Sequence, residues 1–284
     1  MNAPHVLQAY EHQLKSKSAC FPGSHVVFRG LDLHQDPLFA TLDWFGMHVF
    51  GVTGIKLSPA QQNLISFIWT ITSYPDARLW NNRIAALAGG TRSTGCQGVA
   101  GAIAATEALN FGLQPMIHAA DFLVRAEAAM KQGRPLEEIV TDEVAQHKHL
   151  GGYGRPVATL QQDERVVVLK DYIDNLKIAN EIHNCKYFDL AFEIEKVLQK
   201  IGKKLTMNYG SVVLAPLLDL GLTPHQCYLV MVVFLTDGMT PCYQEALERP
   251  PGASFPVRCS SLQYTGKTWE NGLPHRSWSS PIQE

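Results

Sequence analysis

The chain has 284 residues, of which 46% are hydrophobic and 18% are charged, and its net charge is −2. This balance excludes wholesale disorder and argues against nucleic acid or an anionic membrane as the main partner. No apolar run approaches the roughly 18 residues of a membrane-spanning helix, and the first residues lack a signal-peptide pattern. We therefore expect a soluble cytoplasmic protein.

The first part of the chain is predicted to change from a loose arm to helices. Residues 1–24 are polar and are expected to form the arm, and a short strand and turn are expected after it. Helical spacing begins at Leu42, and Ser58-Pro59 marks the next helix start, because serine caps and proline fits the first turn. Residues 83–112 are rich in Ala and Gly. Such small residues allow close helix packing, which we favour over a ligand channel.

The second part is predicted to be helical between short connections. Helices are expected to start near His118, after Pro135, at Asp163, near residue 187 and at Thr223. The helix that follows Thr223 is apolar nearly all round, which predicts burial on all its sides. Strand signals are few, so the fold class is predicted to be mostly α.

Cysteine and histidine patterns give no metal site. Six cysteines are scattered without a C-x-x-C pair, and the eleven histidines show no HExxH spacing. In a cytoplasmic chain such cysteines are expected to be reduced and to fill the core, with a reactive thiol as the alternative. We expect no metal cofactor.

A glycine-rich loop interrupts the helices at residues 149–157, with the sequence HLGGYGRPV. Glycine is used where the main chain turns sharply or comes close to a ligand. The loop is therefore either a tight turn between helices or a place where a ligand contacts the backbone.

The loop and the segment after it, GGYGRPVATLQQDER, resemble the citrate synthase family's P-G-[FY]-G-H-R-V loop and the D-P-R that follows it. Other segments resemble family segments and occur in the family's order: VVFRGLDL, NNRIAALAGG, GLQPMIHAAD, MNYGSVVLAPLLDLGLTP, FLTDGMTPCYQE and VRCSSLQYTG. The resemblance covers roughly residues 25–266, and its strength lies in this collinear order.

The resemblance implies an all-α, citrate synthase-like fold with two domains. Residues 25–117 and 209–284 would form the large helical domain, and residues 118–208 the small one. The active site would lie in the cleft between them, and the working unit would be a homodimer. The implied substrates are a coenzyme A thioester and an organic oxo-acid, joined or cleaved at a carbon–carbon bond without a metal.

The resemblance also assigns site residues. His118 would donate a hydrogen bond to the enolate oxygen, although a purely structural histidine is an equal alternative. Arg155 stands where the family has the loop histidine, and as a candidate catalytic residue it could donate to an oxyanion but not act as an acid near neutral pH. Carboxylate binding would fall to Arg165 and Arg258, since arginine suits carboxylates, and a surface arginine is the alternative for Arg165. The backbone of the loop would contact coenzyme A through Leu150, Gly151, Gly152, Tyr153 and Gly154.

The sequence departs from the family at the catalytic base. Met207 or Asn208 occupies the aspartate position, depending on the alignment, and neither side chain can remove a proton. We keep Asn208 as the candidate catalytic residue there. Leu235 replaces a third arginine, whereas Asp219 and Asp237 lie nearby in sequence. The predicted function is a divergent acyltransferase or lyase, and the alternative is a non-catalytic homologue that binds coenzyme A or an acid, or pairs with an active subunit.

Overall fold

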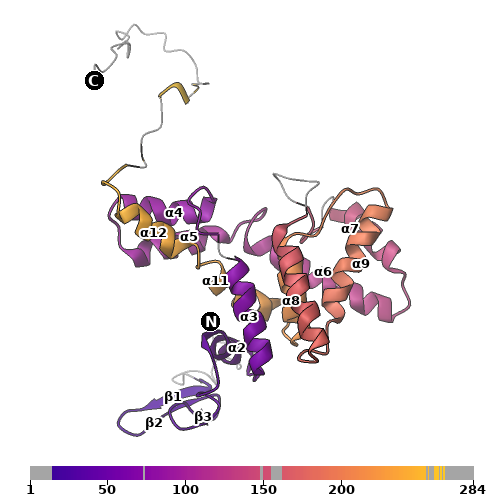
Figure 1. The fold of residues 1–284 in the computed structure, drawn as a ribbon, viewed down its shortest axis with the longest axis horizontal. Helices are drawn as coiled ribbons and strands as arrows, with labels where there is room; N and C mark the ends of the chain where they lie inside the picture. Colours follow the sequence, from indigo (N-terminus) through magenta and orange to yellow (C-terminus); the bar gives the residue numbers. More distant parts are fainter. Residues whose placement is uncertain are drawn as a thin grey trace, which may run out of the picture.

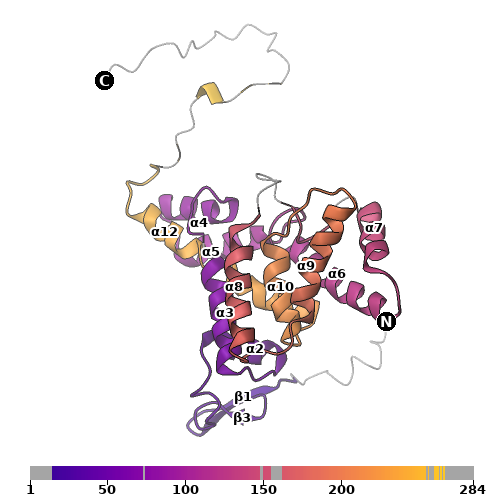
Figure 2. The same cartoon turned by 45° about the vertical axis from the view of Figure 1, so that its right-hand side comes forward.

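The computed structural model describes residues 15–72, 74–147, 150–154, 162–253, 255, 259–261, 263 and 265. This part of the chain contains a small sheet and two groups of helices (Figures 1 and 2). The helices are α2 (Trp44–Thr53), α3 (Pro59–Thr72), α4 (Trp80–Gly90), α5 (Gly95–Thr106), α6 (Leu113–Lys131), α7 (Leu136–His147), α8 (Glu164–Ile178), α9 (Lys186–Lys200), α10 (Tyr209–Asp219), α11 (Pro224–Phe234) and α12 (Met239–Leu247), with a 3-10 turn at Cys259–Ser261.

The sheet is antiparallel and packs on α2. Its strands are β1 (Ser18–Phe21), β2 (His25–Phe28) and β3 (Leu31–Asp32), in the order β1-β2-β3. The Phe28 ring lies 5.7 Å from the Phe50 ring of α2 in an edge-on contact. Arg29 donates two hydrogen bonds to the Gly51 carbonyl and one to that of Val52, which satisfies carbonyls in the last turn of α2. Residues 18–21, predicted to belong to a loose arm, thus form a strand.

Helix α10 is the centre of the larger helix group. Every residue from Ser211 to Leu218 is buried, and α6, α8, α9 and α11 pack against this helix. The prediction that α11 is buried on all sides is wrong, because Leu229 on its outer side is 37% exposed. Both helices have apolar sequences, so their positions in the bundle, and not their composition, decide which one is enclosed.

Helices α4, α5 and α12 form the second group, which lies beside the first in Figure 1. Its buried core consists of the small side chains of Ala85 and Ala102 together with Met239. A Cβ atom at Gly89 would lie 2.4 Å from the carbonyl oxygen of Tyr243, so α4 and α12 touch there through their backbones. Close packing of small residues, predicted for this segment, is confirmed.

Local helix signals are mostly confirmed. Helix α3 begins at Pro59, and Ser58 accepts a hydrogen bond from Gln61 N at 3.3 Å. Helix α11 begins with a full capping box between Thr223 and Gln226. The helix expected near His118 starts earlier, at Leu113, because Gly112 turns the chain with a φ of 80° just before it.

The described cysteines fit a packing role in part. Burial raises the pKa of Cys185 to about 11 and that of Cys227 to about 12, so both stay protonated and unreactive at neutral pH. Cys242 is also buried, whereas Cys20 and Cys96 are exposed, and all five are free thiols.

Among the described residues, no helix is long and apolar enough to cross a bilayer. The same residues contain no cluster of three or more metal-ligating side chains.

Candidate functional site

A cavity of about 1120 Å³ lies among the helix ends. It is larger than the roughly 300–1,000 Å³ of common small-molecule sites. Five helices begin at its wall, namely α4, α6, α8, α10 and α12, as their first or capping residues line it. Helix N-termini carry partial positive charge and unpaired N–H groups, so this wall favours an anionic ligand.

The cavity brings together most residues that the sequence singled out. The lining includes His118, Leu150, Gly151, Gly152, Tyr153, Gly154, Arg165 and Asn208. Arg155 and Arg258 lie outside the described residues, so their positions are not assigned. The roles of all these residues stay predictions, but the structure places eight of them on one cavity.

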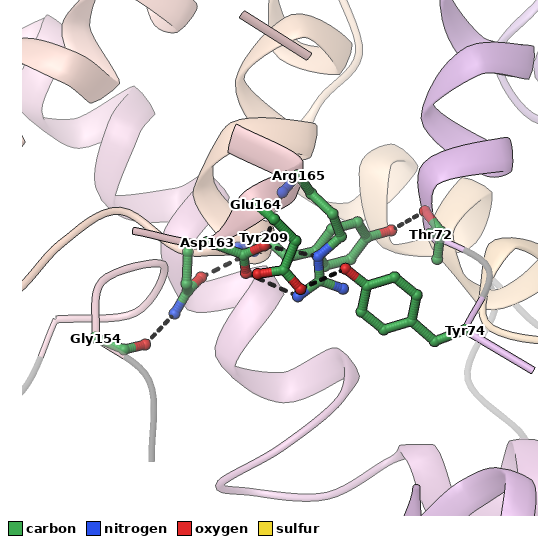
Figure 3. A network of polar contacts seen from close by, with 9 residues as sticks. Thr72, Tyr74, Gly154, Asp163, Glu164, Arg165 and Tyr209 are labelled. Carbon is green, nitrogen blue, oxygen red and sulfur yellow. Dashed lines mark hydrogen bonds and ion pairs between the residues drawn. The ribbon is translucent and has the colours of Figure 1, made fainter. Parts of the chain in front are cut away.

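Arg165 is held by a carboxylate that also caps its own helix. Its Nε and Nη2 donate to the two oxygens of Asp163 at 2.8 and 2.7 Å, and Asp163 is fully buried. Asp163 also accepts from the backbone N–H groups of Arg165 and Tyr209 (Figure 3). The buried charge of Asp163 is thus matched by a cation and several donors, which such burial requires.

Two aromatic rings cover the Arg165 guanidinium. Its central carbon lies 4.8 Å from the centre of the Tyr74 ring and 4.3 Å from that of Tyr209 (Figure 3). Tyr74 donates to Glu164 at 2.6 Å, and Tyr209 hydrogen-bonds to Thr72. Partial burial and the bond to Glu164 raise the pKa of Tyr74 to about 12, and burial raises the pKa of Tyr209 further still. Both phenols are therefore neutral at physiological pH.

This arrangement leaves one edge of Arg165 for a ligand. A guanidinium has five N–H donors, and Asp163 takes one on Nε and one on Nη2. No acceptor among the described residues takes the donors on Nη1 or the second one on Nη2. These donors form a fork that fits a carboxylate, and the side chain is 18% exposed at the cavity. The exposed-surface alternative for Arg165 is thereby disfavoured.

The glycine loop is fastened to the start of α10. Gly154 N donates to Thr206 O at 2.7 Å, and Asn208 N donates to Gly152 O at 2.9 Å. The side chain of Tyr153 points away from the cavity centre into the core, where its hydroxyl donates to Ala191 O at 2.7 Å. Most of this loop therefore presents only backbone atoms to a ligand in the cavity.

The glycines themselves have a packing reason. A Cβ atom at Gly151 would lie 2.8 Å from the Pro115 carbonyl oxygen of α6. One at Gly152, which has a φ of +85°, would lie 2.7 Å from Ser211 Cβ of α10. The loop passes between two helices that a side chain would push apart, so the glycine pattern alone does not indicate a nucleotide.

The position of the expected base holds no proton acceptor. Met207 is fully buried. Asn208 caps α10, where its Oδ1 accepts from Gly210 N at 2.9 Å and its Nδ2 donates to Gly154 O at 2.7 Å. Its amide thus ties the loop to the start of the helix.

His118 is exposed on the second turn of α6, next to Gly151. Its Cβ lies 3.5 Å from the place that a Gly151 Cβ would take. It has no hydrogen-bond partner among the described residues, so its ring can reach a ligand in the cavity. This position is compatible with the predicted donor role and disfavours a satisfied structural histidine.

A second charged group lines the cavity and was not predicted. Arg125 donates to both oxygens of Glu143 at 2.7 and 3.0 Å and to Asp121 at 2.7 Å. The pair Arg125–Glu143 joins α6 to α7, and its partners lie 18 positions apart in the sequence. Only the spacing of Asp121 and Arg125 on one helix face was a possible sequence signal.

The two aspartates near the base position have different surroundings. Asp237 lines the cavity, between α11 and α12. Asp219 lies outside it and accepts from N–H groups in the first turn of α9, those of Tyr187 and Phe188, at 2.9 and 3.0 Å. Burial raises the pKa of Asp219 to about 6. The two hydrogen bonds from backbone N–H groups make Asp219 a cap of α9.

Replacing Asp219 with asparagine should change how stability depends on pH. Because the folded-state pKa is raised, the carboxyl's favourable contribution is present below its ordinary pKa of about 4 and is lost as the pH rises through about 6. We expect the free energy of unfolding of Asp219→Asn, measured with urea from pH 4 to pH 8, to increase relative to that of the unsubstituted chain as the pH rises from about 4 to about 6. Parallel curves for the two proteins would contradict the assignment.

Solved structures with a similar arrangement identify the fold. Citryl-CoA lyase from Hydrogenobacter thermophilus superposes with a TM-score of 0.76 at 17% identity, over 92% of this chain and 97% of that one. ATP citrate lyase from Methanothrix soehngenii, solved with citrate and coenzyme A, gives 0.69 at 14% identity, over 94% of this chain but 45% of that one. Citrate synthase from Thermoplasma acidophilum, solved with carboxymethyl coenzyme A and oxaloacetate, gives 0.58 at 16% identity, over 82% of this chain and 59% of that one.

The chain has the citrate synthase-like fold. This confirms the all-α fold that the collinear segments predicted. No protein-family model and no curated protein matches the sequence. At these identities the citrate synthase-like fold is what the comparisons establish, and the chemistry of the cavity has to be argued from its own residues.

Proposed function

We propose that the chain binds a coenzyme A thioester together with an organic acid in this cavity and acts on a carbon–carbon bond between them. The observation that carries the proposal is the open fork of Arg165 on the cavity wall that the glycine loop also lines. The neighbours with this fold support it, because two were solved with coenzyme A or a derivative and an organic acid.

The cavity's electrostatics fit both ligands. A carboxylate on Arg165 would lie near the first turns of α8 and α10, whose N–H groups add to the attraction. The phosphates of coenzyme A also require positive potential, which the other helix starts supply. The backbone of Gly151 and Gly152 provides a surface without protruding side chains for the adenine.

His118 would act on the thioester in this proposal. Enolate formation needs a donor for the developing oxyanion, and such donors commonly contribute about 10²–10³-fold to the rate. The ring of His118 lines the cavity next to the loop, where a thioester bound along the loop would place its carbonyl. Arg155, which follows the described part of the loop, is a proposed second donor.

Calorimetry on the purified full chain tests the proposal. We expect coenzyme A, acetyl-CoA and either oxaloacetate or citrate each to bind at one site per chain. If no coenzyme A compound and no organic acid bound to the chain, the proposed function would be refuted. Turnover assays in both directions then separate an enzyme from a binding protein.

A non-catalytic binding protein is the second candidate function. The specific observation in its favour is the base position, where Met207 is buried and the Asn208 amide is engaged by Gly210 and Gly154. Binding of both ligands without turnover across a panel of acyl-CoA thioesters would support this candidate.

We also propose a homodimer that forms through the outer face of α5. No charged residue occurs in Gly95–Thr106, and Cys96, Ala100 and Ala104 of this helix are exposed. An uncharged, apolar helix face is typical of a contact surface. We expect the 31.5 kDa chain to elute as a dimer in size-exclusion chromatography with light scattering, and Ala104→Glu to shift it to monomer.

Glu138→Lys on the exposed face of α7 is the control for this substitution. It changes surface charge without touching α5, so the dimer should persist. A monomeric unsubstituted chain at micromolar concentration, or an Ala104→Glu variant that stays dimeric, would contradict this interface.

A further inference from the structure

Four exposed apolar side chains lie on the wall of the cavity. Leu109 and Phe111, in the connection between α5 and α6, are 80% and 50% exposed. Leu79 and Trp80, at the start of α4, are 39% and 38% exposed. All four line the cavity. A single exposed apolar residue is ordinary, but a group of large ones in a cavity is typical of a binding site for an apolar ligand.

The antiparallel packing of α4 and α5 brings the two pairs to one end of this helix group. A Cβ atom at Gly98 would lie 2.9 Å from the Cβ of Ala88, and one at Gly101 would lie 3.7 Å from Ile84. The contacts on α4 therefore move toward its start as those on α5 move toward its end. Continued by about one more turn, this packing places Trp80 beside the end of α5, where the connection to α6 begins.

The connection that carries Leu109 and Phe111 is held at its base. Glu107 and Gly112 form an antiparallel bridge across it. Tyr228 of α11 donates to the Glu107 carboxylate at 3.0 Å, which fastens the base to the larger helix group. The two apolar side chains at the tip are therefore held on the cavity wall, as a preorganised site requires, although they remain exposed to solvent.

The cavity wall changes from apolar to charged along α6. Pro115, His118 and Arg125 line the cavity from one side of this helix, and Phe111 lies just before its first turn. The glycine loop meets the wall between the two ends, since a Cβ atom at Gly151 would lie 2.8 Å from Pro115 O and 3.5 Å from His118 Cβ. A thioester bound along the loop would therefore have the charged end of the wall on one side and the apolar end on the other.

We propose that Leu79, Trp80, Leu109 and Phe111 form a subsite for the apolar acyl chain of the thioester. This inference rests on the proposed function, since it needs a thioester in the cavity, and it narrows the substrate class to acyl-CoA compounds whose chain has several methylene groups. An acetyl group has a single methyl group and cannot cover four large side chains from two connections. A longer chain can cover them, and burying its methylene groups against them is favourable.

Calorimetry on the full chain with a series of thioesters tests the subsite. The ligands are acetyl-, butanoyl-, hexanoyl- and octanoyl-CoA, with free coenzyme A as the reference. Each fully buried methylene group strengthens binding by up to about fourfold. We therefore expect affinity to rise along the series, and octanoyl-CoA to bind at least about 30-fold more tightly than acetyl-CoA.

Substitutions at the tip of the connection locate the effect. Leu109→Ser combined with Phe111→Ser should lower the octanoyl-to-acetyl affinity ratio to below about threefold. Both side chains are exposed, so the double variant should fold, and its binding of free coenzyme A shows that the cavity is intact. Ile178→Ser is the matched control, because Ile178 is 84% exposed at the end of α8 and does not line the cavity. It should keep the full ratio.

The outcomes separate the subsite from the proposed function. Equal affinities of the unsubstituted chain for acetyl- and octanoyl-CoA would overturn the subsite, and so would a ratio that persists in the double variant. With equal affinities, tighter binding of a long 2-oxo acid than of a short one would assign the apolar wall to the acid. A change of the double variant from dimer to monomer would then assign it to a second copy of the chain. If neither a coenzyme A compound nor an organic acid bound, the proposed function itself would fail.

Discussion

Arg165→Lys should weaken organic-acid binding by about 10- to 100-fold and leave coenzyme A binding nearly unchanged. Lysine keeps the positive charge but has no planar fork, so it cannot hold Asp163 and a ligand carboxylate at the same time. In the unsubstituted chain Asp163 takes only the Nε and one Nη2 donor, at 2.8 and 2.7 Å. The loss therefore falls on the edge that faces the cavity.

Calorimetric titration of citrate and oxaloacetate into both proteins measures this effect, with coenzyme A as the internal reference ligand. Arg134→Lys is a matched control, because Arg134 pairs with the exposed Asp142 on the surface and does not line the cavity. Thermal unfolding should accompany the titrations, since weaker contacts to the buried Asp163 lower stability as well. Equal acid affinity for Arg165→Lys and the unsubstituted chain would show that the acid binds elsewhere.

The parts of the fold that the sequence predicted are those with local causes. Ser58-Pro59 and Thr223-Pro224 mark helix starts because a side-chain hydroxyl near the first turn satisfies backbone N–H groups without help from distant residues. The close packing of α4, α5 and α12 followed from composition, since only small residues allow such an approach. The overall fold needed more than local signals and came from the order of several weak resemblances.

The parts that could not be predicted depend on contacts between distant segments. Arg125 and Glu143 meet across two helices, and nothing in either helix alone indicates the partner. Tyr74 and Tyr209 cover Arg165 from separate elements. Asp219 and Asp237 are both near the expected base in sequence, yet one caps α9 and the other lines the cavity.

The glycine loop shows how one sequence signal can have two causes. The pattern predicted either a turn or a ligand site, and the structure shows a loop that packs between helices and also lines the cavity. The absence of side chains at Gly151 and Gly152 allows the loop to pack between α6 and α10. Backbone on the other side of the loop is still available to a ligand, so the two readings are compatible.

Gly152→Ala should destabilise the protein by about 2–5 kcal/mol, the sum of a left-handed backbone penalty and overpacking. Gly152 has a φ of +85°, and an added Cβ would lie 2.7 Å from Ser211 Cβ and 3.1 Å from Ser211 N. Ser211 is fully buried in the central helix α10, so it cannot move away from an added Cβ atom. Urea unfolding of the purified variant measures the loss.

Gly133→Ala separates the two causes, because Gly133 has a nearly equal φ of +88° but no atom within 4 Å of the added Cβ. It should lose only about 1–2 kcal/mol, the backbone penalty alone. Adding Ser211→Gly to Gly152→Ala should recover part of the difference, as expected for residues in direct contact. Since Gly152 O accepts from Asn208 N at 2.9 Å, the strained loop should also displace the start of α10 and weaken acid binding at Arg165. Equal losses for Gly152→Ala and Gly133→Ala would mean that the loop moves away from α10 freely, and that its glycines are not there for packing.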